Sequence, residues 1–436
     1  MFKKIADIFR IPELKRRLLF TMALLVVYRI GGHITTPGVN PIALKAFFQN
    51  QQGTIFALYD LFAGGNLHRA TIFSLGIMPY ISASIIIQLL QAVIPYFEKL
   101  AKEGEEGRKK ITQYTRYGTV ALSMVQAIGV AFFLENMNVG GIPVVPQGGM
   151  FFRLLTIITM TAGTIFVMWL GEQITERGIG NGISLIIMIG IVARYPAEFL
   201  DTWRAMKVGN LTPLRLVFLL VIMVVVIAGV ILITQGQRRI PVQYAKRIVG
   251  RKVYGGKAQY IPLRVNTAGV IPIIFAQSIM MFPSTLAAFF KENTVMAGIM
   301  SVLRPDSLVY MSLYALIIIF FTYFYTAIIL NPVDLAENMQ KYGGFVPGIR
   351  PGKRTSDYID RILTRVTLPG AIFLAFIAVL PDVLIKRGKL PFYFGGTGLL
   401  IVVGVVLDTL QQIESHLLMR HYDGFMKKGH LRGRRF

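Results

Sequence analysis

The feature that most limits how this chain can fold is its series of long apolar runs. Residues 213–235, PLRLVFLLVIMVVVIAGVILITQ, contain a single charged side chain, Arg215. About 20 consecutive apolar residues suffice for a helix to cross a bilayer. Across the chain, 54% of the residues are hydrophobic and 16% are charged, whereas soluble domains have roughly 45–50% and roughly 25%. These runs therefore predict a polytopic membrane protein.

Hydropathy predicts an all-α membrane fold with ten spans. They cover about residues 18–37, 76–95, 115–135, 152–172, 183–200, 213–235, 267–290, 308–331, 367–386 and 395–414. Between the first two spans, residues 55–75 form only half a span, with Asp60, His68 and Arg69 inside it. This segment is too polar to face lipid, so we expect protein or water to protect it. Glycines open the fifth and the tenth span, which hints at duplicated halves.

The orientation follows from the distribution of lysine and arginine, which give the chain a net charge of +24. Segments rich in these residues alternate with poor ones such as 136–150, which contains neither. The rich segments are 1–17, 96–114, 236–266, 332–366 and 415–436. With ten spans they all fall on one side, and the positive-inside rule places them and both termini in the cytoplasm. The N-terminus has no small-residue cleavage site, so we interpret it as a retained amphipathic segment and not as a signal peptide.

The two longest cytoplasmic loops carry structural signals of their own. Residues 236–266 alternate β-branched, aromatic and basic residues around a glycine pair, which predicts a hairpin. In the loop 332–366 the first part has a helical pattern, and GGFVPGIRPG predicts a rigid turn. Such basic surfaces suit anionic lipid, an acidic protein or RNA.

No motif for catalysis, a cofactor or a metal is found, and we expect a protein that is not an enzyme. GIRPGKRT (348–355) is one residue too short between its glycines for a phosphate-binding loop, and Arg354 replaces the required Ser or Thr. The chain has no cysteine, which excludes disulfides and thiolate chemistry. The ionisable residues near the spans are too few at mid-membrane depth for a proton relay, so we expect interfacial or paired roles for them. They are Arg29, Glu172, Asp382 and Asp408.

The segment 76–90, GIMPYISASIIIQLL, combines a file of isoleucines with polar residues. Ile77, Ile81 and Ile85 share one helical face, and Ser84 and Gln88 lie on the same helix. Taken alone, any one of these isoleucines is better explained as an ordinary core or lipid-facing residue. The spacing therefore leaves the purpose of the file open.

Several motifs occur in a fixed order along the chain. GIMPYISASIIIQLL is followed by EGEEGRKKITQYTRYGT, WLGEQITERGIGNGISLII, GQRRIPVQYAKR, NTAGVIPIIFA, FVPGIRPGKRT and PFYFGGTGLLIVV. Through them, essentially the whole chain resembles the SecY family of protein-conducting channels. The resemblance implies that unfolded secretory polypeptides cross a bacterial cytoplasmic membrane through the protein, and that hydrophobic segments leave it sideways into the lipid.

The same resemblance implies two pseudo-symmetric five-helix halves around an hourglass pore. The implied parts are a cytoplasmic segment 1–17, the N-terminal half 18–200, an external hinge loop 201–212, the C-terminal half 213–414 and a basic tail 415–436. A ring of aliphatic side chains forms the constriction. By position the ring falls on Ile77, Ile81, Ile183, Ile187, Ile274 and Ile401. An apolar ring suits a pore for varied polypeptides, because it offers no fixed hydrogen-bond partners and resists ion flow by dewetting.

Two further elements are implied around that ring. A short plug helix seals the pore from outside, with two glycines as hinge points. It comprises Tyr59, Asp60, Leu61, Phe62, Ala63, Gly64, Gly65, Asn66, Leu67, His68, Arg69 and Ala70. A lateral gate between helices carries polar side chains, each worth only about 0.6 kcal/mol in lipid. Its implied residues are Ser84, Gln88, Thr119, Gln126 and Asn266.

The resemblance also implies partners. The subunits SecE and SecG would join the channel, and the SecA ATPase or the ribosome would drive polypeptides bearing signal sequences through it. The residues implied to contact SecA or ribosomal RNA are Arg238, Arg239, Lys246, Arg247, Arg251, Lys252 and Arg350. For any one of these side chains, contact with anionic lipid or a role in topology explains its charge as well.

Two alternatives to a channel stay open at this point. A secondary transporter for a small solute should show charged or polar groups at mid-membrane depth, whereas the ring candidates are hydrocarbon. An insertase or scaffold without a through-pore would not need a plug.

Overall fold

The computed structural model describes most of the chain. The described residues are 11–50, 60, 63–139, 142–209, 212–244, 247–249, 252–254, 259–289, 307–388 and 396–428. The chain divides into two compact units. Unit 1 comprises Met1–Phe199, Ser284–Ala297 and Val405–Phe436, and unit 2 comprises Leu200–Pro283 and Gly298–Gly404. The division into halves 18–200 and 213–414 stays a prediction.

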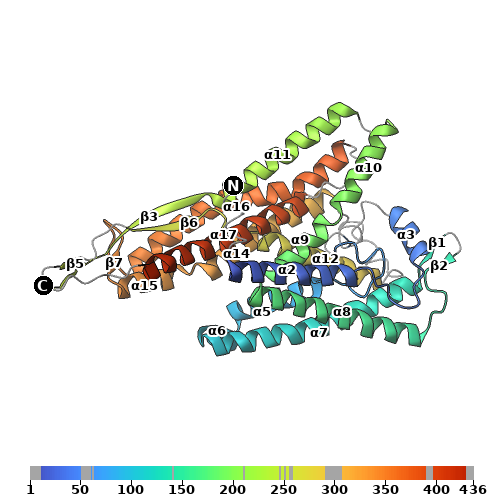
Figure 1. Cartoon of the computed structure of the whole chain (residues 1–436), viewed down its shortest axis with the longest axis horizontal. Coiled ribbons are helices and arrows are strands. Elements are labelled where there is room, and N and C mark those ends of the chain that lie inside the picture. Colours follow the sequence, from blue (N-terminus) through green and yellow to red (C-terminus); the bar gives the residue numbers. More distant parts are fainter. Residues whose placement is uncertain are drawn as a thin grey trace. The chain divides into compact units, whose positions relative to one another are not determined.

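Unit 1 is built mainly from helices (Figure 1). They are α2 (Pro12–Gly31), α3 (Pro41–Asn50), α5 (Met78–Val93), α6 (Pro95–Lys102), α7 (Glu105–Glu135), α8 (Met150–Arg177), α9 (Gly182–Val192) and the start of α10 (Tyr195–Lys207). Helices α7 and α8 run side by side, joined by the small hairpin β1 (Asn138–Val139) and β2 (Ile142–Pro143). Long apolar helices predicted from hydropathy are therefore present here, because each needs only its own sequence to favour a helix in lipid.

A sharp bend ends the second predicted span. Helices α5 and α6 meet at 99°. Ile94 between them is extended (φ −102°, ψ 119°), the conformation favoured before a proline, and Pro95 begins α6 because a first-turn residue needs no N–H donor. The apolar helix thus stops close to the predicted residue 95, and α6 leaves it in a new direction.

The first predicted span has the wrong limits. Helix α2 begins at Pro12 and ends at Gly31, whereas residues 18–37 were expected. Past the helix, Thr35 forms an isolated antiparallel bridge with Thr71. The pair Gly31–Gly32 favours this early end, since glycine is a poor helix former. Apolar composition alone did not distinguish the helix from the extended residues after it.

Unit 2 contains helices and the larger of the sheets. Its helices are the rest of α10, α11 (Pro213–Gln235), most of α12 (Ile271–Phe289), α14 (Leu308–Ile329), α15 (Pro332–Lys341), α16 (Lys353–Gly388) and the start of α17 (Gly396–Lys428), which continues into unit 1. Its strands are β3 (Gln237–Tyr244), β4 (Arg247–Val249), β5 (Lys252–Tyr254), β6 (Gln259–Arg264) and β7 (Gly344–Phe345). The predicted all-α class therefore holds for the apolar segments, but not for the loops.

The predicted hairpin in residues 236–266 is confirmed. Strands β3 and β6 pair antiparallel, from Gln237 with Arg264 to Val242 with Gln259, and β4 and β5 form a second pair beyond them. An unpredicted third strand, β7 from the loop 332–366, pairs with the end of β3. The two cytoplasmic loops of the prediction thus share one sheet, in the order β6-β3-β7.

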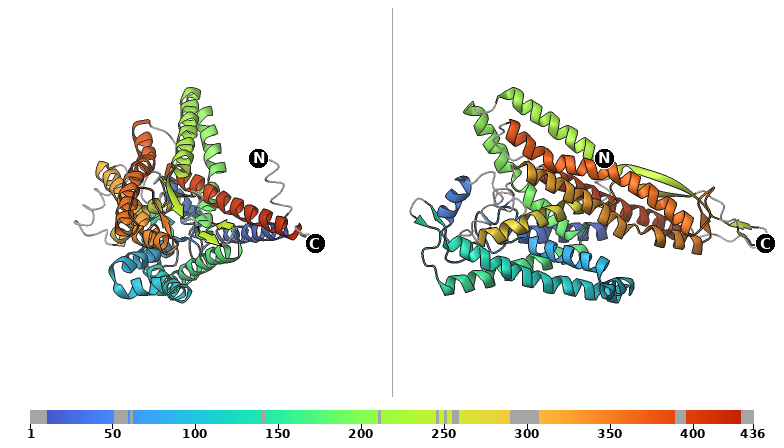
Figure 2. Two further views of the ribbon diagram at one scale, coloured as in Figure 1. Left: turned by 90° about the vertical axis from the view of Figure 1, so that its left-hand side faces the viewer. Right: turned by 180° about the vertical axis from the view of Figure 1, so that it is seen from behind.

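This sheet has a small core of its own, and the ribbon of β3 and β6 lies beside α16 (Figure 2). Ile240 and Val242 of β3 and Leu263 of β6 pack with Ile359 and Leu363 of α16. The latter two lie four residues apart, on one helical face. Helix α16 therefore begins at Lys353, well before the predicted span 367–386, because its first turns bury an apolar stripe against the sheet.

Seven helices of the described chain are long and apolar enough to cross a membrane, or eight if α5 and α6 count together. These candidate spans lie in α7, α8, α9 with most of α10, α11, α14 with α15, α16 and α17. Two predicted spans are not among them. Helix α2 carries Lys15, Arg16, Arg17 and Arg29, and α12 enters only as the shorter apolar stretch Ile271–Met280. A multi-pass membrane protein is supported, and the count of ten spans stays a prediction.

Candidate functional site

The half-span before α5 is the most unusual part of unit 1, since it is polar in sequence and buried in the structure. Ala63 is fully buried, and Leu67 and Ala70 are at most 5% exposed. The expectation that protein protects this segment is confirmed for its described part. We call residues 60 and 63–70, the described part of the expected plug, the turn segment.

The plug helix expected over residues 59–70 does not include residues 63–70. Asp60 is helical, whereas residues 63–70 form consecutive turns. Gly64 (φ +70°) and Gly65 (φ +79°) have left-handed backbone conformations, which end a right-handed helix. Tyr59, Leu61 and Phe62 lie outside the described residues.

Asp60 closes the turn segment on itself. Its Oδ1 atom accepts hydrogen bonds from the backbone N–H groups of Leu67 and His68, each at 3.0 Å. Its Oδ2 atom lies 2.9 Å from His68 Nδ1. Arg69 Nε lies 3.3 Å from His68 Nε2, and because arginine only donates, His68 there accepts at Nε2 and donates from Nδ1 to Asp60.

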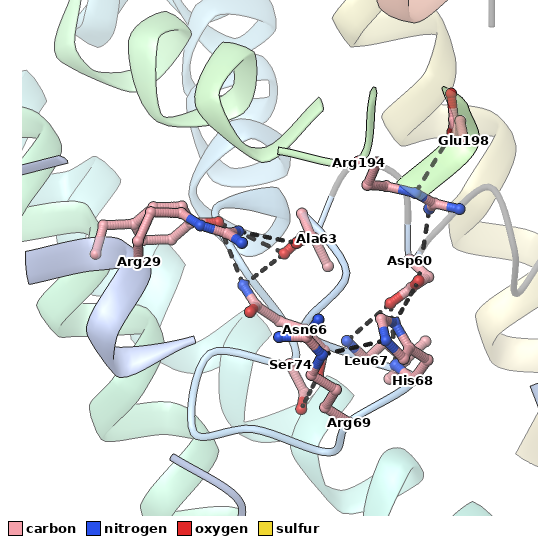
Figure 3. Close-up of polar contacts among 12 residues, drawn as sticks. Arg29, Asp60, Ala63, Asn66, Leu67, His68, Arg69, Ser74, Arg194 and Glu198 are labelled. Carbon is pink, nitrogen blue, oxygen red and sulfur yellow. Dashed lines mark hydrogen bonds and ion pairs between the residues drawn. The ribbon is translucent and has the colours of Figure 1, made fainter. Parts of the chain in front are cut away.

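A second polar group, Asn66, ties the turn segment to helix α2. Asn66 Nδ2 donates to Ala63 O at 2.6 Å and to Tyr28 Oη at 3.3 Å. Arg29 Nη1 donates to Gly64 O at 3.4 Å. These contacts satisfy buried backbone carbonyls that the turns leave without helical partners. Figure 3 shows the side chains converging on the turns.

The turn segment also packs backbone against backbone. A Cβ atom placed on Gly190 of α9 would lie 3.0 Å from Gly64 Cα, so only glycine pairs of this kind allow such an approach. The Thr35–Thr71 bridge is flanked by the bonds Thr36 N–H to Ala70 O (2.7 Å) and Ile72 N–H to Ile34 O (3.0 Å). The segment is thus seated between α9 and the strand-like residues after α2.

One ion pair connects the turn segment to the end of α9. Arg194 Nη1 lies 3.5 Å from Asp60 Oδ2, and Arg194 Nε lies 3.8 Å from Glu198 of α10 (Figure 3). The Asp60 side chain is 7% exposed and that of Arg194 is 32% exposed. Arg194 was not among the candidates from the sequence, so its pairing with Asp60 was missed.

The six ring candidates are aliphatic side chains held inside the two units. In unit 1, Ile77, Ile81 and Ile187 are buried and Ile183 is half-buried. In unit 2, Ile274 of α12 and Ile401 of α17 are buried. The junction of Ile77 with α5 is regular, with Ile81 N–H donating to Ile77 O. Their assembly into one ring stays a prediction.

Helix α9, which carries Ile183 and Ile187, begins at a well-bonded loop. Asn181 caps it by accepting from the N–H groups of Ile183 and Ser184. Gly180 N–H donates to Gln412 Oε1 of α17, and Ile179 N–H donates to Thr21 Oγ1 of α2. Nothing in the sequence pattern indicated these two partners, since they lie far away along the chain.

The predicted gate residues are polar groups with local partners. Gln88 Nε2 donates to Ser84 Oγ within α5, and Thr119 Oγ1 donates to Thr115 O within α7. Gln126 of α7 is buried, and its Oε1 atom makes no hydrogen bond among the described residues. In unit 2, Asn266 is buried and donates to Gly269 O. Their joint role as a gate stays a prediction.

The predicted partner-binding residues lie mainly on the sheet of unit 2. Arg238 and Arg239 of β3 are exposed, and Arg350 is exposed in the turn between β7 and α16. That turn is fixed by the bond from Thr355 Oγ1 to Arg350 O at 2.9 Å. Arg247 lies in β4 and Lys252 in β5, whereas Lys246 and Arg251 lie outside the described residues.

Sequence and structure comparisons agree on one family. The SecY family profile matches residues 71–410. The protein translocase subunit SecY of Escherichia coli (strain K12) is 48% identical over 97% of this chain and 96% of its own length.

Two solved structures are similar in fold. In one of them, the plug domain of the SecY protein stabilises the closed state of the translocation channel and maintains a membrane seal. This structure has a TM-score of 0.64 and 19% sequence identity, and the match covers 95% of this chain and 97% of that chain. The other, Sec61 in the canine ribosome-channel complex, has a TM-score of 0.57 and 18% identity over the same shares. With a profile that matches most of its residues and a relative this close over nearly its full length, the chain belongs to the SecY family.

Proposed function

We propose that this protein is the channel through which unfolded secretory polypeptides cross the bacterial cytoplasmic membrane. The observation that carries the proposal is the 48% identity, over nearly the full length, to a protein named as a protein translocase subunit. The candidate constriction is made of hydrocarbon side chains, which can contact any polypeptide without retaining it. We also propose that the chain crosses the membrane ten times and has both termini in the cytoplasm.

In this proposal Ile77, Ile81, Ile183, Ile187, Ile274 and Ile401 form the ring, with contributions from both units. Isoleucine suits this role because its branched side chain is stiff at χ1 and can fit closely around an extended chain. A polar ring would instead offer hydrogen-bond partners that hold particular sequences. Support comes from the aliphatic character of these side chains and from the burial of all but the half-buried Ile183 in their own units.

The turn segment is the proposed plug. Its seat consists of side-chain hydrogen bonds, one ion pair and a glycine contact, and Leu67 is the large apolar side chain among its described residues. Polar contacts of this kind can break and re-form. In a solved SecY structure of the same fold, a plug domain stabilises the closed state of the channel. We propose that the segment moves away from its seat when a polypeptide enters.

Ser84, Gln88, Thr119, Gln126 and Asn266 are the proposed lateral gate, through which hydrophobic segments pass into lipid. Weak polar contacts suit a seam that must close and still open on binding a signal sequence. Local hydrogen bonds such as Gln88 to Ser84 support this assignment, because they remain intact when helices separate.

The sheet of unit 2 is the proposed docking surface for the partner that supplies the driving energy. The chain lacks a phosphate-binding loop, so energy would come from the SecA ATPase or from the translating ribosome. Arg238, Arg239 and Arg350 are exposed there and suit acidic protein surfaces and RNA phosphates. SecE and SecG are the proposed companion subunits, and anionic phospholipid is a further proposed contact.

One reconstitution tests the proposed channel. The full chain with SecE and SecA is placed in vesicles, a secretory precursor and ATP are added, and protease is applied outside. We expect ATP-dependent accumulation of protease-protected precursor. Absence of protected precursor, together with ion-driven uptake of a small solute, would favour a secondary transporter and overturn the proposal.

A further inference from the structure

Asp60 divides its bonds between two directions, and this division suggests how the turn segment is held. Oδ1 bonds only within the segment, to the N–H groups of Leu67 and His68. Oδ2 bonds to His68 Nδ1 and also reaches outside the segment, to Arg194. The internal bonds can persist if the segment moves as one piece, whereas the contact with Arg194 cannot.

The ion pair is shielded from solvent where its two side chains meet. Arg194 Nη1 is buried and makes no hydrogen bond in the described part of the chain, so its charge is compensated by the Asp60 carboxylate. Removing Arg194 leaves the Asp60 carboxylate, which is 7% exposed, without its partner outside the turn segment. His68 also contacts the Asp60 carboxylate and is itself contacted by Arg69, and Glu198 of α10 also pairs with Arg194.

We propose that the Asp60–Arg194 ion pair is the latch that keeps the plug seated. This inference rests on the proposed function, in which the turn segment is a displaceable plug. The pair exists only in the seated state, so it shifts the equilibrium between seated and displaced plug towards the seated one. Arg194 is thereby a positioning residue: it contacts the plug and not the polypeptide.

A buried reporter measures the displaced fraction directly. Leu67 is 5% exposed in the seated turn segment, and the natural chain has no cysteine. A Leu67→Cys variant in nanodiscs, with its partner subunits, is treated with a charged thiol reagent that reaches both faces. The rate of modification without substrate reports how often the plug leaves its seat.

Two substitutions break the latch. Arg194→Gln removes only the cation. Asp60→Asn keeps an oxygen for the N–H groups of Leu67 and His68, but it removes the charge and the Oδ2 acceptor of His68 Nδ1. We expect each, in the Leu67→Cys background, to raise the modification rate about tenfold, equivalent to ~1.4 kcal/mol. The double latch variant should show the same rise and not the product, because both substitutions remove one interaction. Arg194→Lys should stay near the parent rate, since it keeps the charge.

Lys207→Gln is the matched control, because this cation of α10 contacts the Trp203 ring and is not a partner of Asp60. Its rate should equal the parent rate. Unchanged rates in both latch variants, or rises that multiply in the double variant, would overturn the latch.

The proposed plug is tested separately with the same Leu67→Cys reporter and an intact latch. If the introduced thiol becomes reactive while precursor is being translocated but the latch variants change nothing at rest, only the latch is wrong. If the thiol stays unreactive during productive translocation, the displaceable plug itself is wrong, and the latch with it.

Discussion

At the scale of single residues, the polar side chains of the apolar helices were visible in sequence, but their partners were not. Glu172 and Asp60 are clear anomalies in an apolar chain, and paired roles were expected for the ionisable residues near the spans. The structure pairs Glu172 of α8 with Arg116 of α7, Nε to Oε1 at 2.9 Å and Nη2 to Oε2 at 2.8 Å. Sequence separation hides such pairs, because helical periodicity relates only residues on the same helix.

The Arg116–Glu172 pair should make a measurable contribution to stability. Its geometry is bidentate, and the carboxylate is 13% exposed, although Arg116 is 47% exposed. We expect Glu172→Gln to cost about 1 kcal/mol, the upper end of the range for pairs that solvent still reaches. Thermal unfolding in detergent would record the loss.

Glu98→Gln is the matched control for that substitution. The Glu98–Lys102 pair within α6 is short, at 2.7 Å, but both side chains are more than half exposed. The Glu98→Gln variant should therefore unfold at the same temperature as the parent protein. Equal unfolding temperatures for both variants would contradict the assigned role of Glu172.

At the scale of helices and strands, hydropathy located the apolar parts better than their ends. Helix α11 has the predicted limits, because both of its ends coincide with polar segments. Helix α16 starts earlier than predicted, because Ile359 and Leu363 bury themselves in the core of the sheet. In the turn segment the resemblance implied a helix over residues 59–70, whereas Gly64 and Gly65 have positive φ and residues 63–70 are not helical.

The contact of α9 with the turn segment gives a prediction at this scale. Gly190→Ala would place a methyl group 3.0 Å from Gly64 Cα, too close for the seated arrangement. The turn segment should then sit less firmly, and the resting ion conductance of the channel in planar bilayers should rise several-fold; an overpacked contact of ~1 kcal/mol corresponds to roughly fivefold.

Gly118→Ala serves as its control, since that helical glycine faces Ala83 of α5 at 3.3 Å and does not touch the turn segment. Its resting conductance should match that of the parent protein. A Gly190→Ala channel as tight as the parent would show that the glycine contact does not seat the plug.

At the scale of the whole molecule, the proposed ring draws on both units and on four helices or their immediate starts. The helical spacing at the start of α5 makes three isoleucines equal candidates for the ring: Ile77, Ile81 and Ile85. All three are buried. Only the family resemblance separates the first two from the third and adds residues from α9, α12 and α17. No single helix carries all the residues of the proposed ring.

Serine substitutions test the ring. Replacing Ile81, Ile187 and Ile401 together with serine should make the constriction wettable and raise the resting ion conductance severalfold or more, because dewetting no longer opposes ions. Single-channel recording without substrate would measure it.

Ile85→Ser is the comparison, since Ile85 is 3% exposed on the same helix and lies outside the proposed ring. The Ile85→Ser substitution removes as much buried apolar surface as one ring substitution does, but it should leave the resting conductance low. If Ile85→Ser alone conducts as well as the triple variant, the constriction lies elsewhere on α5.

The sequence by itself determined the membrane class, the apolar core of most helices, the hairpin in residues 236–266 and the family. Each of these depends on local composition, on periodicity or on ordered motifs, which a single chain displays without folding. Tertiary structure decided that β7 joins the two long loops in one sheet, that Gly64 fits against Gly190, and that Asp60 pairs with Arg194. These contacts join segments far apart along the chain, so chain packing, and not local pattern, selects them.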